Sequence, residues 1–163
     1  MRVLYCTSES NPFAGSGGLA DVAGAGSLPK ALKEKGVDCR VVMPLYGDIP
    51  QGLKNQMRYI TNFTVPVGWR SQYCGVFEAY YNDIVYYFLD NEYYFKRSGL
   101  YGFYDDAERF AFFSRAIMEM LPRVNFHPDI LQCNDWQTAL VPTYYYLFYS
   151  RNPWYYNIKS VFT

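Results

Sequence analysis

The groups best suited to chemistry near the start of this 163-residue chain are the backbone amides of a glycine-rich stretch. The stretch, NPFAGSGGLADVAGAG at residues 11–26, follows an apolar run that we expect to be a strand, and it leads into an expected helix. Glycines let backbone N–H groups approach a ligand closely, and a helix start adds the positive end of its dipole. The stretch therefore indicates an anion site, most simply for a phosphate. The alternative is a loop that only needs glycine backbone angles.

Two familiar nucleotide-binding patterns fit this loop poorly. Residues 15–20, GSGGLA, match G-x-G-x-x-A, but seven residues separate the first glycine from the expected strand. Met43 and Pro44 also stand where an acidic residue would hold a ribose. A Walker loop needs Lys-Ser or Lys-Thr after its last glycine, and this loop has neither. A nicotinamide-dependent enzyme is kept as a minor hypothesis, which NAD binding would support.

The composition excludes some functions and favours others. Fifteen basic and fifteen acidic residues cancel, and no basic stripe suggests a nucleic-acid partner. The 18 tyrosines suit stacking on sugars, although tyrosines also pack well in hairpins. The four cysteines are widely spaced, which favours buried free thiols in a reducing cytoplasm. Without a leader pattern or a long apolar run, we expect a cytoplasmic protein with no membrane contact.

The elements that must position these groups follow an α/β order. Strand, helix and strand within the first 44 residues predict a βαβ unit with two parallel strands. Residues 57–90 predict an antiparallel β-hairpin insertion, with a two-residue turn at Asn82 and Asp83. Pro29 and several glycines predict a break inside the first helix. The expected strands are residues 2–7, 38–44, 129–133 and 159–163, and the expected helices are residues 18–36, 105–121 and 138–150.

Four blocks of the sequence resemble the N-terminal part of bacterial glycogen synthases and plant starch synthases. They are SESNPFAGSGGLADVAG, LPKALKEKGVDCRVVMP, YYFKRSGLYGFYDDAERFAFFSRA and PDILQCNDWQTALVP, in the family's order and over almost the whole chain. The resemblance implies a two-domain glycosyltransferase of the GT-B type. Residues 1–163 would be its incomplete N-terminal, acceptor-side, Rossmann-like domain, a truncated parallel sheet. The C-terminal nucleotide-binding domain would be absent.

The resemblance also implies an activity. Such enzymes transfer glucose from ADP-glucose to an α-1,4-glucan with retention, without a metal or other cofactor. The expected partners are therefore ADP-glucose and an α-glucan acceptor, and the location is cytoplasmic, or the plastid for a plant protein. We expect this fragment alone to be inactive and able to self-associate through an open strand edge. The alternative is a non-catalytic relative that binds glucan or a partner synthase.

The family's functional residues can be carried over by position. The implied catalytic residues are Asp21, Gln132 and Asp135. The implied substrate-binding residues are Glu9, Gly15, Gly17, Gly18, Tyr93, Tyr94 and Trp136.

Three departures from the family pattern bear on the activity. The family's lysine falls on Gly15, its usual histidine falls on Gln132, and two extra residues lie between Asp-Val and Leu-Pro. Because a lost cation weakens phosphate stabilisation, we expect a poor synthase even at full length.

Overall fold

The computed structural model describes residues 1–24 and 27–163. The two extra residues fall within residues 23–27, so their effect lies partly outside the described residues. The helix predicted over residues 18–36 is divided into α1 (Gly18–Val22) and α2 (Leu28–Glu34), as the glycines and Pro29 indicate. Pro29 lies in the first turn of α2, where its missing N–H costs no helical hydrogen bond. The predicted break is therefore confirmed.

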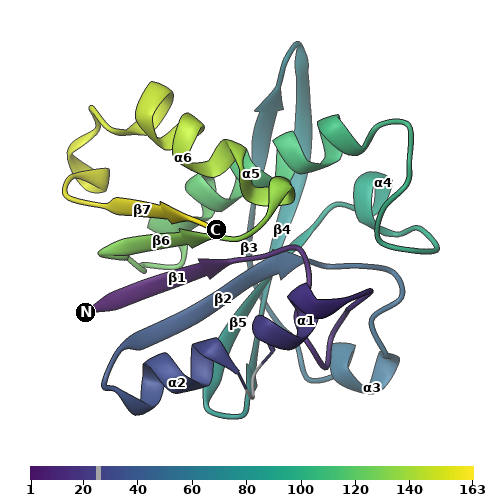
Figure 1. The fold of residues 1–163 in the computed structure, drawn as a ribbon. Helices are drawn as coiled ribbons and strands as arrows, with labels where there is room; N and C mark the ends of the chain where they lie inside the picture. Colours follow the sequence, from purple (N-terminus) through teal and green to yellow (C-terminus); the bar gives the residue numbers. More distant parts are fainter. Residues whose placement is uncertain (25–26) are drawn as a thin grey trace.

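The described residues form one seven-stranded sheet, which confirms the α/β class (Figure 1). Its spatial order is β3-β4-β5-β2-β1-β6-β7. The five strands from β5 to β7 in this order are parallel to one another, and in chain order they read third, second, first, fourth, fifth. This is the order of the Rossmann-type doubly wound sheet. The strands are β1 (Arg2–Cys6), β2 (Asp38–Pro44), β3 (Arg58–Val67), β4 (Arg70–Tyr81), β5 (Ile84–Asp90), β6 (Ile130–Cys133) and β7 (Lys159–Phe162).

The antiparallel pairing predicted for residues 57–90 is confirmed. These residues do not form an insertion apart from the central sheet, however. Strand β4 is antiparallel to both β3 and β5. However, β5 also pairs in parallel with β2, with Val41 opposite Tyr86, so these residues extend the central sheet. The turn at Asn82 and Asp83 is confirmed, with φ values of 47° and 66°. Positive φ at both central residues is typical of a tight hairpin turn.

Helices cover both faces of the sheet, as Figure 1 shows. The amphipathic helix predicted at residues 105–121 is α5 (Asp106–Arg123). It packs with α6 (Leu140–Tyr144) on one face of the sheet, while α2 lies on the other face. The helix predicted at residues 138–150 instead divides into α6 and a π-helical segment. The remaining elements are α3 (Gln51–Lys54), α4 (Glu92–Phe95), α5 (Asp106–Arg123), η1 (Trp136–Thr138), α6 (Leu140–Tyr144), η2 (Tyr145–Tyr149) and η3 (Pro153–Tyr155).

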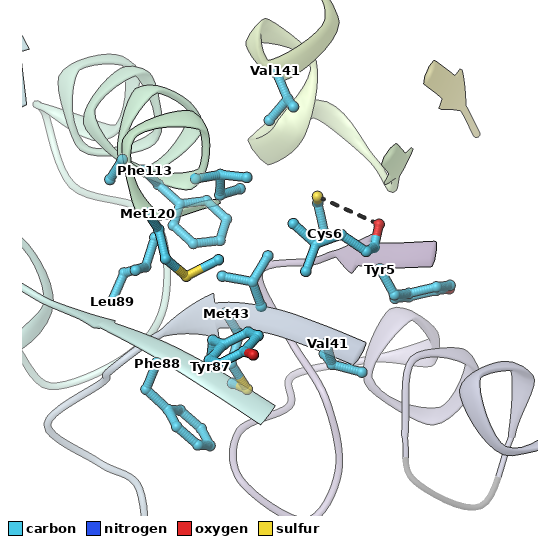
Figure 2. Close-up of a cluster of buried hydrophobic side chains, with 14 of the residues drawn as sticks. Tyr5, Cys6, Val41, Met43, Tyr87, Phe88, Leu89, Phe113, Met120 and Val141 are labelled. Atoms are coloured by element: carbon cyan, nitrogen blue, oxygen red, sulfur yellow. Dashed lines mark hydrogen bonds between the residues drawn. The ribbon is translucent and has the colours of Figure 1, made fainter. Parts of the chain in front are cut away.

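The core lies between the sheet and its helices. Figure 2 shows Phe113 and Met120 of α5 and Val141 of α6, all buried against the sheet. Each such side chain stabilises the fold by roughly 1.5–3 kcal/mol when it leaves water. All four cysteines are free and buried, as expected, and burial raises the pKa of Cys39 to about 12. None of the described helices is both long and apolar enough to cross a membrane.

Candidate functional site

The candidate site lies where the strand order reverses. The connections that leave β1 and β6 run to opposite sides, because β2 flanks β1 on one side and β7 flanks β6 on the other. In open α/β sheets, ligands bind outside the carboxyl ends of the strands at such a switch point. An open pocket of about 460 Å³ lies at this place. It is lined by Gly18, Leu19, Val22, Asn134, Asp135, Phe162 and Thr163.

Asp135 stands in the wall of this pocket in a costly backbone conformation. Its φ of 64° and ψ of 175° lie in a region that is essentially reserved for glycine, at a cost of about 1–3 kcal/mol. Its N–H donates to the Thr163 carbonyl at 2.8 Å, and its Oδ1 accepts from the Trp136 N–H at 2.6 Å. The side chain is exposed, and among the described residues Oδ2 has no hydrogen-bond donor. A carboxylate oxygen therefore faces solvent at the pocket.

Gln132 does not line the pocket, but its side chain contacts a residue that does. Its Nε2 donates to Thr163 Oγ1 at 3.1 Å, and that hydroxyl donates to Asn134 Oδ1 at 3.1 Å. Asn134 Nδ2 in turn donates to the Cys6 carbonyl at 2.8 Å. Gln132 and Asp135 are therefore linked through Thr163: Gln132 donates to its hydroxyl, and the Asp135 N–H donates to its carbonyl. Asn134 and Thr163 line the pocket but were not among the residues predicted from the sequence, although each directly follows a parallel strand.

The glycine loop is partly occupied by the protein's own carboxylate. Glu9 is only 3% exposed, and its two carboxylate oxygens accept from Ser16 N–H at 2.5 Å and Ser16 Oγ at 2.8 Å. By contrast, Gly17 and Gly18 are exposed, and their N–H groups make no hydrogen bond within the described part of the chain. The amides of these two glycines are open to a ligand, while Glu9 shapes the loop from inside.

Two predicted residues lie away from the pocket that contains Asp135. A Cβ atom at Gly15 would stand 2.5 Å from the Ala20 Cβ, so the loop closes tightly around this glycine. Asp21 accepts a hydrogen bond from Asn11 Nδ2 at 2.6 Å and borders a different groove. Because it lies about 100° around α1 from Val22, it does not share the pocket-facing side. The catalytic role of Asp21 and the substrate-binding role of Gly15 stay predictions. Neither residue lines the pocket that contains Asp135.

Trp136 borders the site as an aromatic surface. It is half-exposed, and its ring lies 5.0 Å from that of Phe110 and 5.8 Å from that of Tyr101. The Tyr101 hydroxyl shares a hydrogen bond with Ser8 Oγ at 2.7 Å, which ties the loop after β1 to this surface. Burial raises the pKa of Tyr101, so its hydroxyl stays protonated. Tyr101 was not predicted from the sequence, because only the path of the folded chain brings it next to Trp136.

The two neighbouring tyrosines of α4 differ in exposure. Tyr94 is fully buried, its hydroxyl donates to Glu108 Oε1 at 2.5 Å, and its ring packs 5.0 Å from Phe112. Its side chain packs in the core and is closed to a glucan in this structure, so its assignment to substrate binding stays a prediction without support from its exposure. Tyr93 is 53% exposed and stays a candidate for glucan contact.

The arrangement offers hydrogen-bond donors, a free carboxylate oxygen and an aromatic face. Among the described residues, no three His, Cys, Asp or Glu side chains are grouped to hold a metal ion. The class defined by this fold and site is a Rossmann-like α/β domain with a polar ligand crevice at its switch point.

Comparison with known proteins identifies the family. The family model for the starch synthase catalytic domain matches residues 2–163, and the chain belongs to that family. It is 54% identical over 163 residues to a glycogen synthase of Desulforamulus reducens and 56% identical over 164 residues to one of Clostridium botulinum strain Alaska E43. All of this chain is covered in both comparisons, but only 34% of each relative. The chain therefore spans about a third of the length of these relatives.

A solved structure shows the same fold. The catalytic domain of starch synthase IV from Arabidopsis thaliana, bound to ADP and acarbose, matches with a TM-score of 0.86 and 28% identity. The match covers 98% of this chain and 33% of that one. In both kinds of comparison, this chain corresponds to about a third of a longer protein named as a glycogen synthase or a starch synthase.

Proposed function

We propose that this chain is the N-terminal, acceptor-side part of a GT-B glucosyltransferase that extends an α-1,4-glucan from ADP-glucose with retention. The observation that carries the proposal is Asp135, held in a strained conformation with a free carboxylate oxygen in the pocket that Gly18 also lines. Such strain persists where surrounding structure imposes it, and it is concentrated at functional sites. Family membership and the ADP and acarbose bound to the structural neighbour support the same proposal.

The proposed chemistry assigns a role to each wall of the pocket. Glucosyl transfer develops positive charge on the sugar ring and negative charge on the departing phosphate. The open amides of Gly17 and Gly18 donate to the phosphate, while the Asp135 carboxylate stabilises the ring. Asn134 and Thr163 offer neutral oxygens beside Asp135. A second domain supplies the remaining phosphate contacts, so residues 1–163 alone are inactive, and the reaction requires no metal or other cofactor.

The same loop gives a reason to keep a second function. Glu9 already places a negative charge on Ser16 N–H, and the Gly15 position carries no cation. Both features disfavour a phosphate at the first part of the loop. A non-catalytic relative that binds glucan, or a partner synthase, would tolerate them.

The test compares this chain alone with the same chain joined to the remaining two thirds of the D. reducens glycogen synthase. Transfer of labelled glucose from ADP-glucose to glycogen is measured for both. We expect transfer only by the joined protein, and Asp135→Asn should lower its kcat on the order of 10²–10³-fold. Asp38→Asn is the matched control, because Asp38 is an exposed carboxylate at the opposite end of the parallel sheet.

Three outcomes of this test would count against the proposed function or a part of it. Full activity of the Asp135→Asn variant would contradict the role of Asp135. A joined protein that binds maltooligosaccharides but transfers no glucose would favour the non-catalytic relative. A joined protein that binds NAD but no glucan would contradict both functions.

A further inference from the structure

Asp135 keeps its strained backbone because contacts hold the chain on both sides of it. Its N–H donates to the Thr163 carbonyl at 2.8 Å. Its own carbonyl accepts from the Thr138 N–H at 3.1 Å, in the single turn of η1. A residue stays in a sparsely populated conformation only where the surrounding structure imposes it. The contacts around Asp135 therefore decide where its carboxylate points.

The Thr138 hydroxyl is the side-chain group that joins the two sides of this turn. Its Oγ1 donates to the Asn134 carbonyl at 2.9 Å and lies 3.2 Å from the Asp135 carbonyl. The hydroxyl thus bridges the peptide groups before and after the Asp135 Cα atom. The Thr138 side chain is fully buried and does not line the pocket. It can therefore act on a ligand in the pocket only through Asp135.

Asn134 ties the same turn to the neighbouring strand ends. Its N–H and its Nδ2 both donate to the Cys6 carbonyl, at 3.2 Å and 2.8 Å. Its Oδ1 accepts from Thr163 Oγ1 at 3.1 Å. The ends of β1, β6 and β7, which pair side by side (Figure 1), thus form a fixed base for the turn. The Thr138 hydroxyl connects Asp135 to this base through the Asn134 carbonyl.

We propose that Thr138 is a positioning residue, whose hydroxyl holds the Asp135 backbone so that the free carboxylate oxygen faces the pocket. This inference rests on the proposed function, in which that carboxylate stabilises the sugar ring. Without the hydroxyl, the chain can relax toward an ordinary negative φ, which moves the Asp135 side chain. A small displacement of a reacting group lowers the rate of an enzyme steeply.

The first experiment needs no activity and uses the 163-residue chain. Hydrogen exchange is measured at the amide of Asp135 and, as a reference, at that of Val42, which is buried in β2. Thr138→Val keeps the shape of the side chain but removes the hydroxyl. We expect exchange about tenfold faster at Asp135, the size expected for one hydrogen bond, and unchanged exchange at Val42.

Two further variants control this experiment. Thr138→Ser keeps the hydroxyl and should restore the wild-type exchange at Asp135. Thr64→Val makes the same chemical change at an exposed position of β3, and it should alter neither amide.

The second experiment measures transfer by the joined protein. Thr138→Val should lower kcat about tenfold and leave KM for ADP-glucose unchanged, since the amides of Gly17 and Gly18 stay in place. Thr138→Ser should restore kcat. In an Asp135→Asn background, Thr138→Val should cause no further loss, because no charge is left to position. A residue that only stabilised the fold would lower kcat by the same factor in both backgrounds.

The outcomes separate this inference from the proposed function. Unchanged exchange at Asp135 in Thr138→Val, or equal acceleration at Asp135 and Val42, overturns the positioning role. An equal loss of kcat in both backgrounds also overturns it. If Thr138→Val transfers glucose at the wild-type rate while Asp135→Asn does not, the proposed function stands and this inference fails. If the joined protein transfers no glucose, the proposed function fails, and the exchange rates alone decide whether Thr138 positions Asp135.

Discussion

Two segments beside the crevice are held in different ways. The segment between α4 and α5 is fixed along its length: Gly99 N–H donates to Asp48 at 2.7 Å, Gly102 N–H donates to Asp106 at 2.8 Å, and Arg97 pairs with Asp105. In the glycine loop, the described contacts of residues 15–17 are the Glu9–Ser16 contact and a turn hydrogen bond from Ala20 N–H to the Gly17 carbonyl.

The difference bears on what the glycine loop is proposed to bind. A phosphate loop must direct several amides at one anion, and a loop with few competing hydrogen bonds can adjust to do so. The sparsely bonded loop carries the open amides of Gly17 and Gly18.

The largest expected effect on folding comes from removing the anchor of the fixed segment. Arg109 is fully buried and donates to the Tyr94 carbonyl at 2.7 Å, the Leu100 carbonyl at 3.0 Å and Asp106 at 2.6 Å. Arg109→Ala breaks a buried ion pair and leaves two carbonyls without donors, so unfolding should become easier by about 3–5 kcal/mol. Urea denaturation measures the change.

The control for this prediction is Arg58→Ala. Arg58 pairs with Glu78 at 3.0 Å, but its side chain is 74% exposed, so its loss should cost no more than about 1 kcal/mol. Similar losses for the two variants would show that the segment between α4 and α5 is not fixed by Arg109.

Much of the fold could be predicted from local sequence. The apolar run of β1, the βαβ unit and the turn at Asn82 and Asp83 all depend on neighbouring residues, and all are confirmed. The parallel pairing of β5 with β2 could not be predicted, because it joins strands separated by some 40 residues through non-local packing. Strand runs show which segments pair, but the order of strands depends on the whole core.

The candidate site was less predictable for a similar reason. Tyr93 and Tyr94 have the same chemistry in the sequence, and only the rotation of about 100° per helical residue buries one and exposes the other. Glu9 was assigned to the ligand because it follows β1, but the path of the loop turns it toward Ser16. Asp135 was identified through its family motif, whereas its positive φ is a property of the folded backbone.

An intermediate effect on folding is expected at Glu9. Glu9→Gln keeps the size of the side chain but removes the charge that strengthens both hydrogen bonds from Ser16. A hydrogen bond to a charged group contributes roughly 1.5–3 kcal/mol, so we expect a loss at the lower end, about 1.5 kcal/mol. Hydrogen exchange should also become faster at the Ser16 amide, which reports the loop directly.

Glu34→Gln serves as the control for this change. Glu34 is exposed and lies 4.0 Å from Lys30, so its charge should contribute almost nothing. Unchanged exchange at Ser16 in the Glu9→Gln variant would mean that the loop is fixed by other contacts, and the comparison of the two segments would lose its basis.

The smallest expected effect on folding, and the most informative for function, concerns Gly15. Gly15→Lys places a Cβ 2.5 Å from the Ala20 Cβ, and neither atom can rotate away, so the single variant should lose about 1 kcal/mol. Ala20→Gly removes the obstructing methyl at a cost of about 1 kcal/mol in helix propensity. Because the two changes relieve each other, the double variant should lose less than the sum of the single losses.

The same pair of substitutions tests why the loop should be a weak phosphate site. In the joined protein, Gly15→Lys/Ala20→Gly supplies a cation without the steric conflict, so transfer from ADP-glucose should become faster than with Ala20→Gly alone. Gly15→Lys without room for its Cβ should gain less, since the loop must shift to admit it. If transfer rates stay equal across the three variants, the missing cation does not limit the reaction, and the Glu9 carboxylate on Ser16 becomes the remaining explanation for a weak site.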